Sequence, residues 1–159
     1  MIIGGLMKKE EKGCLFCQIK RGERPTNLVY YDNKCFVILD IFPSQKGHML
    51  VISREHHKSF LATPDSINDH DFQIAKKFAK KAKEKLKATG IKLVVNVGKD
   101  AGQLIEHTHI HIIPHYHPIV EYTTNPNPEI TEKEAAAMLK LLSEVSNVHA
   151  FQNHNLDTL

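Results

Sequence analysis

The stretch His107-Thr108-His109-Ile110-His111-Ile112-Ile113 places a histidine at every second position, with threonine or isoleucine between them. Successive side chains of a β-strand point to opposite faces, so this alternation predicts a strand whose three histidines share one face. Two residues of a strand span about 6.6 Å, which separates the Cα atoms of His107 and His111 by ~13 Å. One metal ion cannot collect all three rings at that separation without distortion, so we expect the histidines to have different roles.

Apolar and β-branched runs elsewhere predict the rest of a sheet. The expected strands are residues 28–31, 35–39, 49–52, 92–97 and 106–113. Asp32-Asn33 and the segment from Gly98 to Gly102 supply turns between neighbouring strands. Five short strands with hairpin connections and two longer helices predict an α+β domain with a largely antiparallel sheet.

Helix signals lie on both sides of these strands. Leu15, Phe16 and Ile19 suit a short helix that Gly22 and Pro25 end. A long helix is expected from a Thr63 cap and Pro64 to about Ala88, with Gly90 as its left-handed stop. Thr131 and Glu134 form a capping-box pattern, which predicts a last helix over residues 135–145.

Composition limits the class of protein. The chain has 159 residues, of which 42% are hydrophobic and 25% charged, as in an ordinary single globular domain. No apolar run is long enough to span a membrane, and charges follow the first apolar stretch, which is the reverse of a secretory signal. Three cysteines, an odd number, fit a reducing interior. We therefore expect a cytoplasmic protein without a membrane partner.

Net charge limits the partners. Lys and Arg number 21 against 18 Asp and Glu, a net charge of +3 that is too small to favour nucleic acid as the main ligand. Lysines gather on the predicted long helix, but no aromatic residues interleave them for stacking on bases. The small positive bias suits an anionic small molecule.

The histidine stretch has several chemical interpretations. Neutral imidazole is a good nucleophile at pH 7, and charged imidazole is a proton donor and phosphate partner. A metal cluster and a plain surface strand are the alternatives. A metal-dependent hydrolase would also need a nearby carboxylate ligand, and Glu106 is expected on the opposite face. Nucleophilic or acid–base chemistry is favoured.

The histidine stretch resembles the motif of the histidine triad superfamily, His-φ-His-φ-His-φ-φ, where φ is an apolar residue. The motif is preceded by a glutamine, and here the preceding residues are Gly102-Gln103-Leu104-Ile105-Glu106, with Pro114 after the stretch. Thr108 is a mild departure. Further matches follow in order between Gly13 and His115: Cys14-Leu15-Phe16-Cys17, Gly22-Glu23-Arg24-Pro25, Leu39-Asp40-Ile41, residues 46–52 (KGHMLVI) and Asn96. The resemblance implies an α+β meander, a five-stranded antiparallel sheet with two main helices, that pairs as a homodimer. The expected histidine triad domain covers residues 13–118. Residues 1–12, a short apolar stretch followed by charges, predict a disordered leader, and residues 119–159 predict an extension with one helix and a polar tail.

For function, the resemblance implies a hydrolase or transferase that cleaves purine nucleotides, adenosine conjugates among them, at the α-phosphate. The implied substrates are nucleoside phosphoramidates or dinucleoside polyphosphates, and a nucleotide-binding regulatory module with little turnover is the alternative. His109 would be the nucleophile that forms a nucleotidyl-histidine intermediate. The implied substrate-binding residues are His48, His111, Gln103 and Asn96 at the phosphate, Asp40 at the ribose, and Phe16, Ile19 and Phe36 at the base. Each of these residues also has a structural alternative: the polar residues are common in turns and at strand ends, and the apolar residues are common in the core.

One position departs from the pattern of phosphoramidate-cleaving members, which often carry a serine directly after the motif glutamine. This chain has Leu104 there. Either the proton for a leaving amine comes from elsewhere, or the preferred leaving group is one that needs less help, such as a phosphate.

Cys14 and Cys17 form a C-x-x-C pair, whose two thiolates can share one tetrahedral ion if two more ligands are found. Redox and core roles remain open on spacing alone. The resemblance implies a structural zinc held by Cys14, Cys17, His56 and His107, although the adjacent His57 leaves the third ligand ambiguous. Cys35, inside an apolar strand, is expected to be packing.

Overall fold

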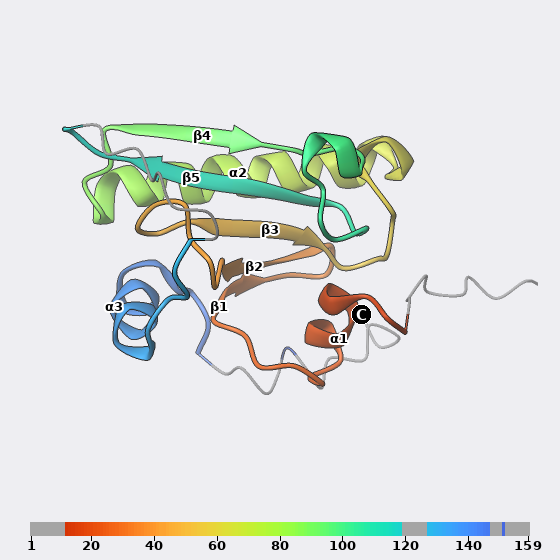
Figure 1. Cartoon of the computed structure of the whole chain (residues 1–159), viewed down its shortest axis with the longest axis horizontal. Coiled ribbons are helices and arrows are strands. Elements are labelled where there is room, and N and C mark those ends of the chain that lie inside the picture. Colours follow the sequence, from red (N-terminus) through yellow and green to blue (C-terminus); the bar gives the residue numbers. More distant parts are fainter. Residues whose placement is uncertain (1–11, 119–126, 147–150, 152–159) are drawn as a thin grey trace, which may run out of the picture.

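A single antiparallel sheet forms the centre of the computed structural model, which describes residues 12–118, 127–146 and 151. The strand order is β1-β2-β3-β5-β4 (Figure 1). The strands are β1 (Leu28–Tyr31), β2 (Cys35–Leu39), β3 (Met49–Ser53), β4 (Gly90–Val94) and β5 (His109–His115). The predicted α+β class, with five antiparallel strands, is confirmed.

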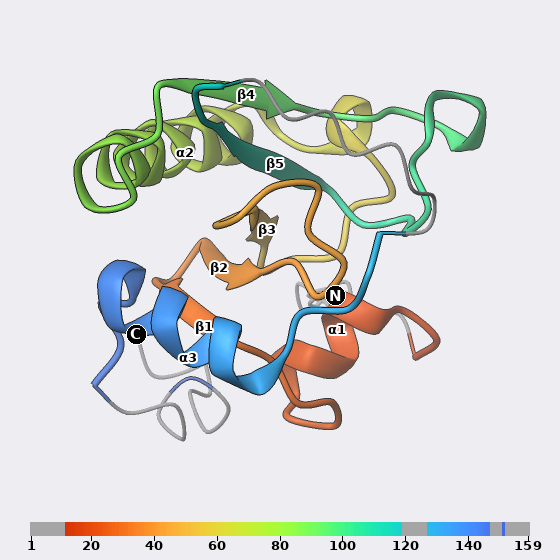
Figure 2. The ribbon, with the colours of Figure 1, turned by 60° about the vertical axis from the view of Figure 1, so that its left-hand side comes forward.

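The two faces of the sheet carry different cover, as the two ribbon views show (Figure 2). Helices α2 (Asp65–Lys85) and α3 (Glu132–Leu142) pack on one face, where Val37, Val51 and Phe78 belong to one buried cluster. The short helix α1 (Leu15–Lys20) packs on the other face, where Phe36 and Ile52 belong to a second cluster. The register pairs Ile52 with His109, so the histidines of β5 share the α1 face.

Helix boundaries differ in part from the sequence expectations. The capping box of Thr131 and Glu134 is confirmed, with both reciprocal hydrogen bonds present, but α3 ends at Leu142. Thr63 does not cap α2, because its hydroxyl donates to the Ser59 carbonyl, 2.9 Å away, and lies 2.6 Å from the Thr108 hydroxyl. The Thr63 hydroxyl therefore ties the start of α2 to the histidine stretch.

The end of α2 and the start of β4 also differ. The left-handed residue is Lys87 (φ 61°), whereas Gly90 is the first residue of β4. β4 ends at Val94 rather than at residue 97, and β5 starts at His109 rather than at residue 106. Residues 95–108 instead form a connecting segment, so His107 lies just before the strand, not inside it.

No helix among the described residues is long and apolar enough to cross a bilayer. Residues 1–11 of the expected leader, and most of the expected polar tail, lie outside the described residues. The domain boundaries at residues 13 and 118 stay a prediction.

Candidate functional site

His109 is the centre of the candidate site, and its ring has a defined tautomer. Its Nδ1 lies 2.6 Å from the backbone carbonyl oxygen of His107. Two acceptors would repel at that distance, so Nδ1 carries the proton and donates, which leaves the lone pair on Nε2. The side chain is buried, and burial is the main cause that lowers the pKa of His109. A neutral ring with a defined lone pair is the form that a nucleophile requires.

His48 and His111 form a relay of hydrogen bonds next to this ring. The Ser44 backbone N–H donates to His48 Nδ1 over 3.0 Å, and His48 Nε2 lies 2.9 Å from His111 Nδ1. Because Nδ1 of His48 accepts, its proton is on Nε2 and is donated to His111. His111 in turn carries its own proton on Nε2, where it can be donated to an anion.

Burial lowers the pKa of both His48 and His111 to about 4. For His111, the positive charges that His109 and His48 can carry lower the pKa further. Both rings are therefore neutral at pH 7. The loop that presents His48 is built around Gly47, whose φ is +83°, and a Cβ there would collide with Leu86 of the α2 cap. Only glycine fits that turn.

Asp40 lies at the end of β2, close to the same histidines. Its Oδ1 accepts a hydrogen bond from the Phe42 N–H over 2.8 Å, and its Oδ2 is 3.5 Å from His48 Nε2. The pKa of the Asp40 carboxyl is raised, and burial is the largest cause. The Phe42 N–H, His111 and His109 act in the opposite direction. The carboxylate is thus held in place through one oxygen, and the other faces the histidines.

Gln103 and Asn96 lie in the segment between β4 and β5. The Gln103 amide donates to the carbonyls of Lys58 (2.7 Å) and Ile105 (3.0 Å) and accepts from the Gly98 N–H (2.9 Å). Asn96 Nδ2 donates to the Gly102 carbonyl over 3.5 Å. These bonds shape the loop that leads to His107. The phosphate contacts expected of both residues stay predictions.

The apolar residues expected at the base differ in their positions. Phe16 packs edge-on against His109, with ring centroids 5.1 Å apart, and Ile19 is buried on the same helix. Phe36 has no exposed surface and packs against Phe151 at 5.1 Å. Phe36 therefore occupies the core position that the sequence left open, and its predicted contact with a base stays a prediction.

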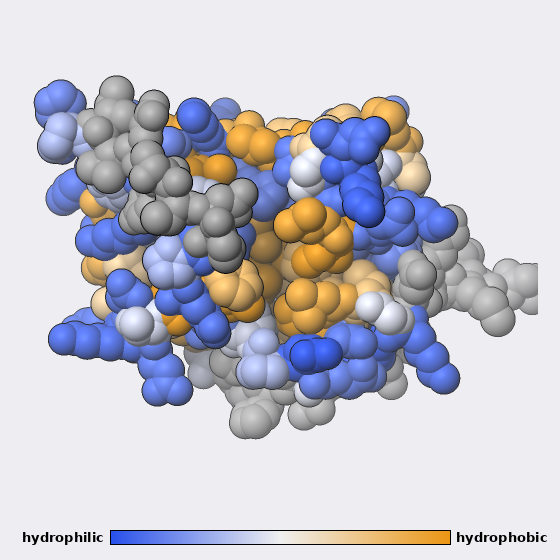
Figure 3. Space-filling model, in the orientation of Figure 1, coloured by the Kyte–Doolittle hydropathy of each residue, from blue (hydrophilic) through white to orange (hydrophobic). Residues whose placement is uncertain are grey.

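A hollow of about 330 Å³ opens beside α1. It is lined by Gly13, Cys14, Leu15, Leu104, Ile105 and Glu106. Apolar side chains gather on this face of the molecule between α1 and the segment that precedes β5 (Figure 3). Leu104, the departure from the family motif, is 89% exposed there.

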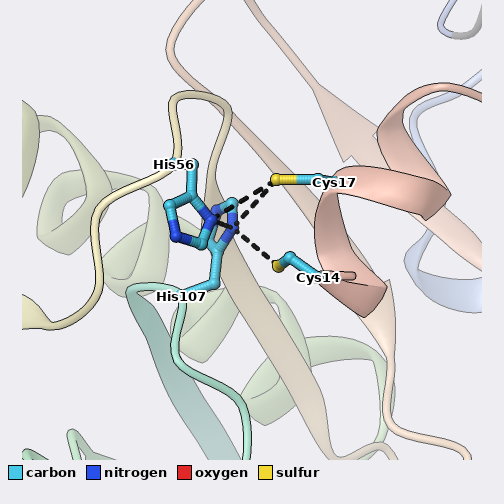
Figure 4. Close-up of side chains that lie close together, drawn as sticks. All are labelled: Cys14, Cys17, His56 and His107. Carbon is cyan, nitrogen blue, oxygen red and sulfur yellow. Dashed lines mark hydrogen bonds between the residues drawn. The ribbon is translucent and has the colours of Figure 1, made fainter. Parts of the chain in front are cut away.

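The four residues expected to bind metal come together at the other end of the histidine stretch. Cys14 and Cys17 of the α1 region face His56 and His107 (Figure 4), and their ligand atoms all lie within 4.8 Å of one another. Nδ1 of His107 is 3.4 Å from Cys14 Sγ, 3.6 Å from Cys17 Sγ and 3.2 Å from His56 Nδ1. One ring nitrogen cannot serve three hydrogen-bond partners, since it has a single proton or a single lone pair.

An ion at the centre accounts for the same distances. In a tetrahedral zinc site with Cys and His ligands, neighbouring ligand atoms lie roughly 3.3–3.8 Å apart. Nε2 of His107 lies 2.7 Å from the Ser53 carbonyl oxygen, so the ring proton is on Nε2 and Nδ1 is free to bind a metal. The cluster is compatible with zinc. His56, not His57, joins it, which resolves the ambiguity in the sequence, and His57 Nε2 instead lies 3.5 Å from Glu55.

Comparison with known proteins identifies the family. The family model described as "HIT domain" matches residues 21–118. The chain belongs to the histidine triad (HIT) family. An uncharacterized HIT-like protein of Saccharolobus solfataricus is 37% identical over 101 residues, which is 64% of this chain and 73% of that protein. An adenylylsulfatase of Arabidopsis thaliana is 41% identical over 107 residues, 65% of this chain and 53% of the relative.

Solved structures give the same family. A hypothetical histidine triad nucleotide-binding protein from Sulfolobus tokodaii strain7 is similar with a TM-score of 0.74 and 32% identity, over 81% of this chain and 89% of the other. A Zn-bound histidine triad family protein from Mycobacterium smegmatis has a TM-score of 0.72 and 29% identity, over 80% and 91%. The expected fold and superfamily are confirmed.

The HIT site also depends on groups that the sequence analysis missed. The Ser44 N–H, the Ser53 carbonyl and the His107 carbonyl set the tautomers of His48, His107 and His109. These are backbone groups, and every residue has them. No side-chain pattern could have identified them before the register of the strands was known.

Proposed function

We propose that the protein is a nucleotidyl hydrolase or transferase that cleaves purine nucleotide conjugates, adenosine conjugates in particular, at the α-phosphate. The proposed substrates are nucleoside phosphoramidates or dinucleoside polyphosphates. The observation that carries this proposal is the tautomer of His109, whose Nδ1–H donates to the His107 carbonyl and leaves Nε2 as the attacking atom.

In the first step, the Nε2 lone pair forms a bond to the α-phosphorus while the bond from phosphorus to the leaving group breaks. The leaving group departs with that electron pair; an amine takes up a proton from solvent, whereas a phosphate leaves without one. The substituted ring is then cationic, because Nδ1 keeps its proton, and the hydrogen bond to the His107 carbonyl stabilises the charge. Water next attacks phosphorus and the N–P bond breaks, which regenerates neutral His109 and releases the nucleoside monophosphate. Two easier displacements replace one difficult displacement.

The remaining residues hold the anion and the nucleoside. His111 donates its Nε2–H to an α-phosphate oxygen, and His48 positions that ring through its own Nε2–H. Asp40 accepts hydrogen bonds from the ribose hydroxyls through the oxygen that Phe42 does not occupy. Gln103 and Asn96 contact phosphate oxygens, and Phe16, Ile19 and Phe36 form the wall against the base.

Zinc is the proposed cofactor, bound by Cys14, Cys17, His56 and His107. When bound, the ion supplies structural cross-linking and no reaction chemistry. The four ligands come from α1, the loop after β3 and the segment before β5, so the ion joins the helix that carries Phe16 to the strand that carries His109. The Zn-bound Mycobacterium smegmatis relative supports this assignment.

The names of relatives support the substrate class. One is an adenylylsulfatase, and another is described as a nucleotide-binding protein. A homodimer joined through the sheets is the proposed assembly. Strand β4 lies at the end of the strand order, where its outer edge can pair with a second copy.

The test is to trap the intermediate. The protein is mixed with an adenosine phosphoramidate or a diadenosine polyphosphate, quenched rapidly and digested for mass spectrometry. We expect an adenylate adduct on the peptide that contains His109, absent in His109→Ala and retained in His117→Ala. An adduct on another residue, or turnover without any adduct at His109, would overturn the mechanism. Binding without either turnover or adduct would favour the regulatory module instead.

A further inference from the structure

A second cluster of metal-binding side chains lies between the β1–β2 turn and α2 and shares no residue with the HIT site. Its members are Asp32, Cys35 and His70, whose ligand atoms all lie within 4.8 Å of one another. Cys35 belongs to the core on the α2 face of the sheet, whereas the histidines of β5 are on the α1 face. The mechanism proposed above uses none of the three residues.

The turn fixes the orientation of the Asp32 carboxylate. Its Oδ1 accepts hydrogen bonds from the backbone N–H groups of Lys34 and Cys35, each over 2.8 Å. This pair of bonds leaves Oδ2 directed at α2, where it lies 2.7 Å from His70 Nε2 and also accepts from the Tyr30 hydroxyl over 2.9 Å. The carboxylate, the imidazole and the thiol therefore converge from two elements that are far apart in the sequence.

An independent observation comes from the neighbouring residue of α2. Asp71 is 1% exposed, and its Oδ1 has no hydrogen-bond partner among the described residues. Asp71 interacts electrostatically with Asp32, and Lys34 is the nearby positive charge. A buried carboxyl oxygen without a partner is costly, and a cation beside it removes that cost.

We propose that Asp32, Cys35 and His70 bind a divalent transition-metal ion of the zinc class, at a site separate from the Cys14/Cys17 cluster. One thiolate, one imidazole and one carboxylate are the ligand types that zinc and cobalt accept, and three protein ligands leave a fourth position for water. The side chains of His70 and Asp32 are 24% and 19% exposed, so an ion reaches the cluster from solvent.

Binding changes the proton positions at two atoms. The Cys35 thiol loses its proton to solvent as the sulfur–metal bond forms. His70 moves its ring proton from Nε2 to Nδ1, and Nε2 and Asp32 Oδ2, now 2.7 Å apart as hydrogen-bond partners, separate so that both bind the metal. One proton is released for each ion bound.

The test measures metal stoichiometry on the full chain with the first cluster already loaded with zinc. Cobalt(II) is added, native mass spectrometry separates species with one zinc and one cobalt from species that have exchanged zinc, and absorption reports thiolate-to-cobalt charge transfer. We expect one cobalt per chain beside the retained zinc, with a charge-transfer band. In His70→Gln and Cys35→Ala the affinity for this second ion should fall at least about tenfold, since each removes one ligand. His117→Ala is the matched control and should bind cobalt as the wild type does.

His70→Gln keeps a side chain of similar size at a partly exposed position, so it remains informative if Cys35→Ala does not fold. Binding of only one metal ion by the wild type, or a second ion that both variants keep, would overturn the proposal. A second ion without charge transfer would show binding by other histidines and would also overturn it. Because the readout is metal content, it stands apart from the adduct test of the proposed function.

Discussion

His107 and His109 are two residues apart in one stretch of chain, yet their rings have opposite proton positions. His107 donates Nε2–H to the Ser53 carbonyl over 2.7 Å and keeps the lone pair on Nδ1, which faces two thiols. His109 donates Nδ1–H to the His107 carbonyl over 2.6 Å and keeps the lone pair on Nε2. In both residues a backbone carbonyl sets the tautomer, and the tautomer decides which nitrogen is available for chemistry.

The difference separates the site into a proposed metal end and a proposed phosphate end. The metal end comprises Cys14, Cys17, His56 and His107, and the phosphate end comprises His48, His109 and His111. One peptide unit joins them, because the carbonyl of His107 holds the ring of His109 while the ring of His107 faces the cysteines. The metal end should therefore control stability and the position of the nucleophile, and the phosphate end should control turnover.

The largest expected effect is at the phosphate end. His109→Ala removes the proposed nucleophile, so kcat/KM for an adenosine phosphoramidate should fall by about 10⁴-fold or more. Zinc content should change little, since the metal ligands are untouched. Steady-state kinetics and metal analysis on the same preparation measure kcat/KM and zinc content together. Wild-type turnover in this variant would remove the distinction between the two ends.

The second prediction concerns the metal end and uses adjacent histidines as a matched pair. His56→Gln removes a proposed zinc ligand and should lower zinc content well below one per chain. We expect a loss of about 3 kcal/mol of stability, which corresponds to a fall of roughly 10 °C in melting temperature for a domain of this size. His57→Gln should keep the zinc.

Metal analysis and thermal melting, with and without added zinc, measure these effects. If both variants keep their zinc, or if both lose it, the cluster does not bind metal through His56 as proposed. A chelator should reproduce the stability loss in the wild type and leave His56→Gln unaffected.

The third prediction is a pH dependence that belongs to the phosphate end. Burial lowers the pKa of His48 and of His111 to about 4 from the ordinary 6.5. Between these values the unfolded chain binds protons that the folded chain does not, so stability should fall as pH decreases from 6.5 to 4, by roughly 2 kcal/mol per group. His48→Gln should weaken this slope.

Urea unfolding at several pH values, with zinc content measured at each, separates this effect from metal release. Burial also lowers the pKa of His109, so the loss of kcat/KM at acid pH should be centred below pH 6.5. A steep loss of kcat/KM centred at pH 6.5 would contradict the buried, neutral nucleophile.

The resemblance to the histidine triad family predicted that Cys14, Cys17, His56 and His107 come together, and they do. Sequence periodicity was enough to predict the sheet, because strand alternation and the two buried faces leave few arrangements. It was not enough for the ends of elements, where tertiary contacts decide: the Thr63 hydroxyl bonds to Ser59 and Thr108 instead of capping α2. Periodicity also could not predict the histidine tautomers, since these depend on backbone carbonyls that every residue carries.

The smallest expected effect concerns Leu104, which lies three residues before His107 and takes the place of the serine that phosphoramidate-cleaving members often carry. Its side chain is 89% exposed, so Leu104→Ser should change stability by less than about 0.5 kcal/mol and leave zinc content unchanged. The new hydroxyl can donate a proton toward a departing amine. Because solvent competes for an exposed hydroxyl, we expect only about a fivefold rise in kcat/KM for a phosphoramidate relative to a dinucleoside polyphosphate.

Leu61→Ser is the matched control for this substitution, since Leu61 is 78% exposed and lies in the short helical turn at Phe60–Ala62. It should leave the ratio of the two kcat/KM values unchanged. If Leu104→Ser and Leu61→Ser behave alike, Leu104 does not face the leaving group, and the segment before His107 serves the metal end alone. If only Leu104→Ser shifts the ratio, the segment that presents the last metal ligand also selects the group that His109 displaces.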